Sequence, residues 1–334
     1  MIQRLTIIHS YKNALTMKNI QREDIQIISR HASLTKEGID KVLKENIYNN
    51  KAEWEKFLSM FFISLGVGFT VLGLVFFFAY NWADLHKFAK IGLTEGLILV
   101  TTSFVLFPKI NINIRNIILT GASVLVGVLF AVFGQIYQTG ANAYEFFLAW
   151  TVFVTLWVIV SNFAPLWLFY LVLINTTLIL FTQQVASDWS VIFVFTLLFI
   201  LNSTVLIIAI LLPKFKDVAH VPNWLSNTVA LASVGYATIG IIIGIFDKYQ
   251  QAFPVLIVMT VAMFALGIWH GLKTKSLFYL AVIPFCLIII VSALLVKISD
   301  AEVMFLLLSV FIISSVTLVI KNLITLQKEW INEK

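Results

Sequence analysis

The chain has 334 residues, of which 60% are hydrophobic and 12% are charged, and its formal net charge at pH 7 is +6. About a quarter of the residues in an ordinary soluble domain are charged, so this composition excludes a cytosolic, secreted or disordered protein. It suits a membrane protein, because ten helices of about 20 residues would use about 200 residues.

The residues that usually hold metals are sparse in this sequence. There is one cysteine, Cys286, and the five histidines are scattered along the chain. A disulfide within the chain and a thiolate metal site are therefore excluded, and we expect no metal and no cofactor. The excess of positive charge follows the loops between apolar runs, so it indicates membrane topology and not a nucleic-acid partner.

Residues 1–56 are predicted to form a cytosolic amino-terminal amphipathic helical segment. Apolar residues recur at roughly helical spacing between residues 17 and 56, which predicts two short helices. Ser33 and Thr35 are candidate N-caps for the second helix, over 36–46. The segment is either a packed leader that orients the first span or a docking module for a cytosolic protein partner.

Residues 57–320 are predicted to form a transmembrane bundle, followed by a cytosolic tail at 321–334. Each apolar run is close to the length that crosses about 30 Å of hydrocarbon as a helix. The fold class is therefore all-α, a polytopic bundle of about ten spans in the lipid bilayer. The predicted spans are 57–80, 89–107, 117–138, 145–161, 165–182, 190–212, 228–246, 254–272, 276–296 and 303–320.

The fourth and fifth spans, 145–161 and 165–182, lie very close together in the sequence. Only residues 162–164 separate them, so a tight hairpin is required if both cross. The sequence leaves open whether both do. In the ninth span, Pro284 lies well inside the apolar run and should kink the helix.

The distribution of basic residues gives the expected orientation. With an even number of spans, 19 of the 23 Lys and Arg residues fall on the side that holds both termini, and four fall on the other. The positive-inside rule then places both termini in the cytoplasm.

Glu95 is the first candidate functional residue. It lies about 10 Å into the second predicted span, counted from Phe88 at 1.5 Å per residue. A carboxylate at that depth is costly unless it is protonated, paired or hydrated, and such residues often handle protons or cations. The structural alternative is that Glu95 pairs with Lys90 or another lysine on the outer side.

A second candidate region runs from Gly134 to Glu145. If it stayed helical, four polar residues would share one face; Gly140 makes a break equally plausible. A broken helix can expose backbone groups to a substrate, whereas the alternative is an ordinary polar loop between two spans. The four polar residues are Gln135, Gln138, Asn142 and Glu145.

The connection between the first two spans carries a third group of polar residues. Asp84 can cap the second helix and Trp82 can anchor at the membrane interface, as can Trp150 later in the chain. Topology places Asn81 and Asp84 in the same outer half of the membrane as Glu95 and residues 135–145. We therefore expect a polar, net acidic pocket there.

Several runs in the first half of the chain resemble a bacterial integral-membrane family catalogued as domain of unknown function 2157. The resemblance covers roughly residues 20–180 and implies a bacterial inner-membrane protein with a cytosolic amino-terminal helical segment. It implies no activity. The runs that carry it are Leu65-Gly66-Val67-Gly68 through Ala79-Tyr80-Asn81-Trp82, then Leu85 and Lys90, the run Gly134-Gln135-Ile136-Tyr137-Gln138, Trp150, and Leu34 with Gly38-Ile39.

The leading functional hypothesis is a transporter or small-ligand-binding membrane protein with a polar site in the outer half. Glu95 would carry a proton or cation, and the amides and carboxylate of 135–145 would face an unknown small molecule or ion. The alternative is a non-transporting envelope scaffold, sensor or assembly factor that uses residues 17–56 to recruit a partner. An enzyme is not expected, because no nucleophile–base pair or metal constellation is visible.

Overall fold

A computed structural model describes most of the chain. The described residues are 36–46, 51–80, 85–107, 110–137, 140–215, 221–247, 250–298 and 303–332.

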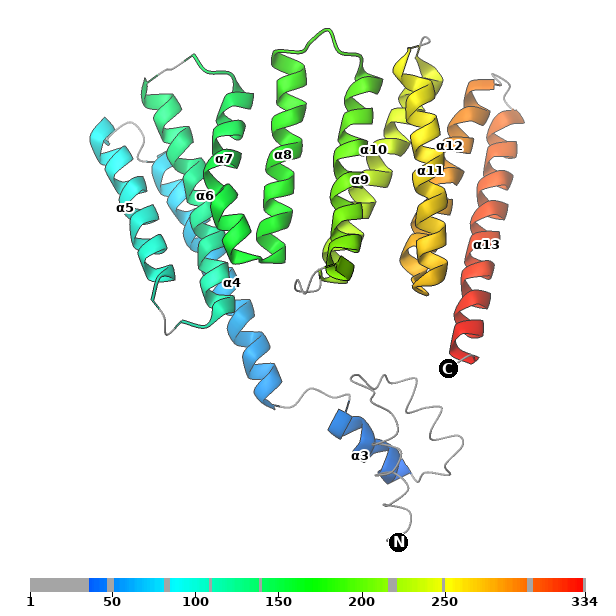
Figure 1. The fold of residues 1–334 in the computed structure, drawn as a ribbon, viewed down its shortest axis with the longest axis horizontal. Helices are drawn as coiled ribbons and strands as arrows, with labels where there is room; N and C mark the ends of the chain where they lie inside the picture. The colour runs from blue at the N-terminus through cyan, green and yellow to red at the C-terminus, as the bar shows by residue number, and fades with distance from the viewer. Residues whose placement is uncertain are drawn as a thin grey trace. The chain divides into compact units, whose positions relative to one another are not determined.

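The described residues form helices and contain no strand (Figure 1). Ten of these helices are long and apolar enough to cross a membrane, which confirms the all-α polytopic fold. The helices are α3 (Lys36–Asn46), α4 (Lys51–Tyr80), α5 (Lys87–Val105), α6 (Ile112–Tyr137), α7 (Ala143–Ser161), α8 (Ala164–Gln184), α9 (Val191–Phe215), α10 (Asn223–Phe246), α11 (Ala252–Lys273), α12 (Leu277–Ile298) and α13 (Val303–Asn332).

The first and last long helices extend beyond the predicted spans. Helix α4 begins at Lys51 and not at 57, and α13 continues through residues 321–332, which were expected to be a tail. Each has 30 residues and is therefore about 45 Å long, which exceeds the roughly 30 Å of hydrocarbon. Both helices are therefore longer than a crossing of the hydrocarbon requires.

Helix α3 has the bounds that the sequence predicts for the second amphipathic helix. Glu37 and Asp40 are exposed, whereas Ile39, Val42 and Leu43 are half-buried. The helix therefore has one apolar face. The first predicted helix and the two candidate caps, Ser33 and Thr35, lie outside the described residues.

The fourth and fifth predicted spans form an antiparallel hairpin of α7 and α8. Asn162 adopts a left-handed conformation with φ of 44°, and its N–H donates to Val158 O at 3.3 Å. Farther along the hairpin, Thr155 Oγ1 and Tyr170 Oη lie 3.0 Å apart. The short connection therefore reverses the chain between two separate long helices.

The chain divides into two compact units. The first consists of residues 1–79 and 107–118, and the second of residues 80–106 and 119–334. In the first unit, the Asn113 amide lies 4.0 Å from Met60 Sδ, between α6 and α4. The apolar groove on α4 is lined by Phe61, Ser64, Leu65, Gly68, Phe69 and Leu72.

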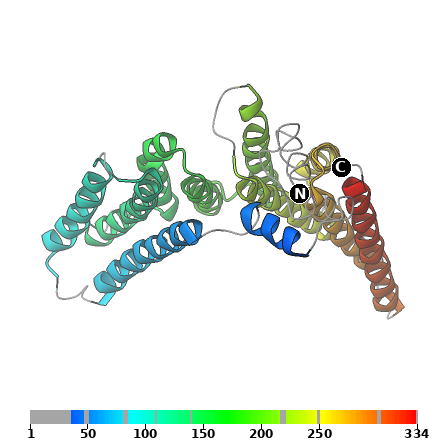
Figure 2. The same cartoon turned by 90° about the horizontal axis from the view of Figure 1, so that it is seen from below.

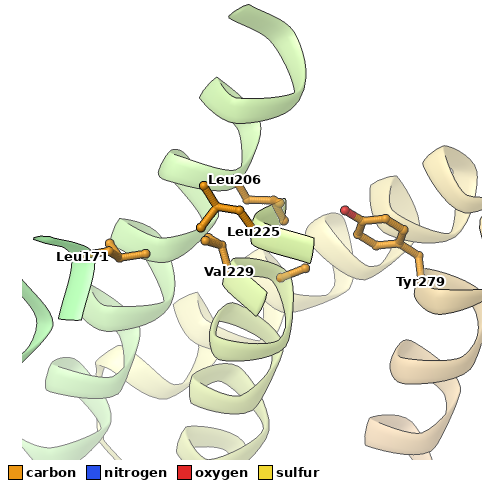
Figure 3. Close-up of a cluster of buried hydrophobic side chains, with 6 residues drawn as sticks. Leu171, Leu206, Leu225, Val229 and Tyr279 are labelled. Atoms are coloured by element: carbon orange, nitrogen blue, oxygen red, sulfur yellow. The ribbon is translucent and has the colours of Figure 1, made fainter. Parts of the chain in front are cut away.

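The second unit contains a core between α8, α9, α10 and α12. Leu171, Leu206, Leu225 and Val229 are buried there together with Tyr279 (Figure 3). Successive helices from α7 to α13 alternate in direction, and Figure 2 views them from one end. Pro284 lies inside α12, and the helix continues on both sides of it. This unit positions most of the buried polar side chains.

Candidate functional site

Glu95 lies near the middle of α5, about 12 Å from Lys87 at 1.5 Å per residue. Its side chain is exposed and forms no hydrogen bond or ion pair within the described residues. The buried residues of this helix, Lys90, Thr94 and Val105, lie roughly 80° to 140° around the helix axis from Glu95, at about 100° per residue. The carboxylate therefore lies to one side of the buried face of α5 and not on it.

The polar region from 134 to 145 contains a break between two helices. Helix α6 ends at Tyr137, α7 begins at Ala143, and Gly140 has φ of 65°, in the left-handed region. Of the two alternatives that the sequence left open, the structure has the break. Gln135 is exposed in the last turn of α6, so it does not share a continuous helix face with Glu145.

Asn142 and Glu145 start helix α7. They form a capping box, in which the Asn142 N–H donates to Glu145 Oε2 at 3.2 Å. Tyr144 Oη donates to Glu145 Oε1 at 3.2 Å, and the Tyr144 N–H donates to Gln184 Oε1 of α8 at 3.0 Å. These side chains satisfy backbone donors that a helix start leaves unpaired. Both predicted site residues therefore have a structural role, and both remain exposed.

The structure brings some predicted site residues together and leaves others outside its described parts. Asn142 and Glu145 are in contact, whereas no described hydrogen bond joins either of them to Glu95 or Gln135. Asn81, Trp82 and Asp84, in the connection before α5, lie outside the described residues, as does Gln138.

Trp150, expected to anchor at the membrane interface, packs between helices. Its Nε1 donates to Ser123 O of α6 at 2.7 Å, and its ring lies 5.5 Å from that of Phe169 in α8. A Cβ added at Gly127 would overlap with the indole ring. Trp150 thus joins α6, α7 and α8.

A pair of buried amides in the second unit was not identified from the sequence. Asn202 of α9 is fully buried and Asn175 of α8 is 8% exposed. Asn202 Nδ2 donates to Asn175 Oδ1 at 2.7 Å and to Leu198 O at 2.8 Å. Asn175 Nδ2 donates to Leu171 O at 2.7 Å and lies 3.4 Å from Asn202 Oδ1. The two amides satisfy each other in the middle of two apolar helices.

A second polar bridge lies on the next residue of α9. Ser203 Oγ and Ser233 Oγ of α10 are 2.7 Å apart, and both residues are buried. Helix α9 is therefore linked to α8 by Asn202 and to α10 by Ser203. The sequence carried a signal for this arrangement, because polar residues inside apolar spans usually face other helices.

The described polar side chains differ in how far they are open to a ligand. No group of three or more His, Cys, Asp or Glu side chains in the described parts of the chain could hold a metal ion. The buried amides and hydroxyls donate to and accept from one another, whereas the Glu95 carboxylate remains available. Glu95 is consequently the described site residue best placed to bind something from outside the chain.

One comparison with known proteins found a match in the first half of the chain. A family model described as "Predicted membrane protein (DUF2157)" matches residues 34–167. No curated protein and no solved structure matches the chain. The match covers α3 to α7 and the start of α8, within the range over which the sequence resembles this family. Residues 34–167 thus confirm the resemblance to DUF2157, a family of predicted membrane proteins.

Proposed function

We propose that this multi-pass membrane protein binds a small cation, or a small ligand together with a proton, at Glu95. The observation that carries the proposal is a carboxylate near the middle of an apolar helix, exposed and without a partner among the described residues. A charge at that depth is costly in hydrocarbon, so a proton, a cation or a polar group must neutralise it. Binding or transport without chemical conversion accounts for such a residue.

The predicted ligand-facing residues differ in whether the structure already gives them another role. Gln135 is exposed and remains a candidate contact, and Gln138, three positions later in the sequence, remains a candidate from its residue type. Asn142 and Glu145 already bond to the start of α7, so any ligand contact would be additional to that role. Asn81 and Asp84 belong to the proposal through their predicted position on the same side.

The proposed location is the bacterial inner membrane with both termini in the cytoplasm. The loop charges support it, because 19 of 23 basic residues fall on the side of the termini. Ten candidate spans, an even number, are consistent with termini on one side.

Thermal unfolding in detergent tests the role of Glu95. The midpoint would be measured in NaCl, KCl and CaCl2 at constant ionic strength and across pH, for wild type and Glu95→Gln. A ligand that binds only the folded state raises the midpoint by mass action. We expect a saturable rise in the wild type that Glu95→Gln loses.

Glu55→Gln is the matched control for this experiment. Glu55 is exposed near the start of α4, where it pairs with Lys51 at 3.8 Å. The Glu55→Gln substitution removes one carboxylate, as Glu95→Gln does, but from a position outside the predicted spans. The control should retain the rise, and identical profiles for wild type and Glu95→Gln would refute the proposal.

A scaffold or assembly role is the second candidate, favoured by the apolar face of α3. Ile39, Val42 and Leu43 lie on one side of a charged helix, an arrangement that binds in apolar grooves of other proteins. Under this candidate, Ile39→Ser with Leu43→Ser should abolish function in cells while the thermal midpoint of the membrane part is kept. Unchanged function in that variant would exclude α3 as the docking surface.

A further inference from the structure

A row of aromatic rings joins the start of α7, the end of α8 and the start of α9, which lie at the same end of the three helices (Figure 1). This aromatic row consists of Tyr144, Phe181, Trp189 and Phe193. Two carboxylates adjoin it in the sequence, Glu145 next to Tyr144 and Asp188 next to Trp189. We propose that the aromatic row and these two carboxylates bind the ammonium group of an organic molecule.

The rings of the aromatic row meet edge to face. The Phe181 centroid lies 5.4 Å from that of Tyr144 and 5.9 Å from that of Trp189, and the Trp189 and Phe193 centroids are 5.1 Å apart. Trp189 is 40% exposed and Phe193 is 37% exposed, so the end of the row at α9 is open to a ligand. The negative faces of aromatic rings attract cations, and the face of tryptophan attracts them most strongly.

Hydrogen bonds fix the Glu145 carboxylate beside the aromatic row. Tyr144 Oη donates to Glu145 Oε1 at 3.2 Å, and the Asn142 N–H donates to Glu145 Oε2 at 3.2 Å. The Tyr144 N–H donates to Gln184 Oε1 at 3.0 Å, which ties the start of α7 to the end of α8. A carboxylate has about four lone-pair sites, so both oxygens can still accept a bond from a ligand. An ammonium group at the row would therefore meet a negative charge that is already held in place.

The helices that form this site bring only negative charge to it. Glu145 and Asp188 are the only charged residues between positions 116 and 213, a stretch that contains no Lys, Arg or His. Neither carboxylate forms an ion pair within the part of the chain that the structure describes. A cationic ligand complements this end of the three helices, whereas an anionic ligand would be repelled.

The combination of rings and carboxylates favours an organic ammonium group over a metal ion. Calcium binds about six or more oxygen ligands, and no group of three or more His, Cys, Asp or Glu side chains among the described residues could hold a metal. An ammonium group with carbon substituents can lie against ring faces and still keep its charge near a carboxylate. Soluble amines carry such a group, and so do phospholipids with an ethanolamine headgroup.

Quenching of Trp189 fluorescence tests the proposal on the full chain in nonionic detergent micelles at constant ionic strength. The probe is a nitroxide that carries a trimethylammonium group, and its matched control is the uncharged hydroxyl nitroxide. The Trp189→Phe variant defines the share of the fluorescence that belongs to Trp189. We expect the cationic nitroxide to quench this share saturably and at a lower concentration than the uncharged one. Glu145→Gln and Asp188→Asn should each raise the half-quenching concentration of the cationic nitroxide about threefold.

Two controls separate ligand binding from a change in folding or in overall charge. The Asp188 side chain forms no hydrogen bond among the described residues, so Asp188→Asn should keep the thermal midpoint. Glu55→Gln removes an exposed carboxylate from α4 and should leave the quenching curve unchanged. Equal quenching of Trp189 by both nitroxides, or unchanged curves for Glu145→Gln and Asp188→Asn, would overturn the proposal. The site does not include Glu95, so that result would leave the proposed role of Glu95 standing.

Competition identifies the source of the ammonium group. Tetramethylammonium chloride should displace the cationic nitroxide and restore the Trp189 fluorescence, and failure to do so would also overturn the proposal. Phosphatidylethanolamine is then added to the micelles, with diacylglycerol as the control that lacks a headgroup. Displacement by phosphatidylethanolamine but not by diacylglycerol would assign a lipid headgroup to the site, whereas displacement by tetramethylammonium alone would assign a soluble amine.

Discussion

The indole ring of Trp150 in α7 covers the backbone of Gly127 in α6. A Cβ added at Gly127 would overlap with the ring carbons of Trp150, and Trp150 Nε1 donates to Ser123 O at 2.7 Å. Ser123 Oγ in turn donates to Leu119 O at 2.9 Å. Glycine at 127 therefore allows the indole ring of Trp150 to approach α6 closely.

Replacement of Gly127 by alanine should destabilise this contact. We expect Gly127→Ala to lower the free energy of unfolding by about 1–3 kcal/mol, because an extra methyl group overpacks a filled site. Reversible unfolding in mixed micelles would measure it. Gly134→Ala, in the same helix and with nothing within 4 Å of its added Cβ, is the control. Equal stability of the two variants would contradict the close approach.

The amide pair of Asn175 and Asn202 predicts an energetic coupling between α8 and α9. Loss of either amide leaves the other buried with fewer partners, so each single alanine variant should be destabilised. The double variant should lose less than the sum of the two, with a coupling of about 0.5–2 kcal/mol. A double-mutant cycle measures this coupling.

Thr196→Val provides a control for the amide pair. Thr196 is buried in the same helix as Asn202, but its Oγ1 donates to Ile192 O of its own helix at 2.7 Å. Loss of the Thr196 hydroxyl should leave no other side chain without its hydrogen-bond partner. If the Asn175 and Asn202 variants were strictly additive, the interhelical bond would contribute nothing to stability.

Glu145 offers a test that separates a cap from a ligand site. Glu145→Ala removes the acceptor for the Asn142 N–H and should cost about 0.5–2 kcal/mol, as loss of a helix cap does. Glu145→Gln keeps an acceptor oxygen and should retain most of the stability. The Glu145→Gln variant would be compared with the wild type for stability and for stabilisation by ions. If it unfolds like the wild type but is no longer stabilised by ions, the Glu145 charge itself binds a ligand.

The left-handed conformation of Gly140 predicts a cost for any side chain there. With φ of 65°, Gly140→Ala should lower the free energy of unfolding by about 1–2 kcal/mol, although nothing lies within 4 Å of the added Cβ. Gly92→Ala, in helix α5 and equally open, should be neutral or stabilising. Thermal midpoints of the two variants would reveal the difference, and equal midpoints would contradict it.

Predictions from the sequence succeeded where they depended on local pattern. The helix over 36–46 has the predicted bounds, and the short connection after Ser161 does separate two long helices. Helices α4 and α13 extend beyond the predicted spans, because residues such as Lys51 and Lys321 are polar but still helical. Hydropathy marks where a chain leaves hydrocarbon, and a helix can continue beyond that point.

The roles of individual polar residues were harder to predict. Asn142 and Glu145 were chosen as ligand groups for their polarity, and the structure uses them to start α7. Asn175 and Asn202 are separated by 27 positions along the chain, so nothing local indicates that their amides meet. Sequence pattern locates a polar group along the chain, whereas its partner depends on how helices pack.

The sequence by itself determined that this protein lives in a membrane, with about ten helical spans and basic loops mainly on one side. Those properties follow from composition and from the lengths of the hydrophobic runs, which can be read along the chain without knowing which helices are in contact. Only the tertiary structure decided that Glu95 is exposed while Asn202 and Trp150 bond to neighbouring helices. The rotation of a helix about its own axis decides this, and in a helix that is apolar all around, that rotation is set by contacts with other helices.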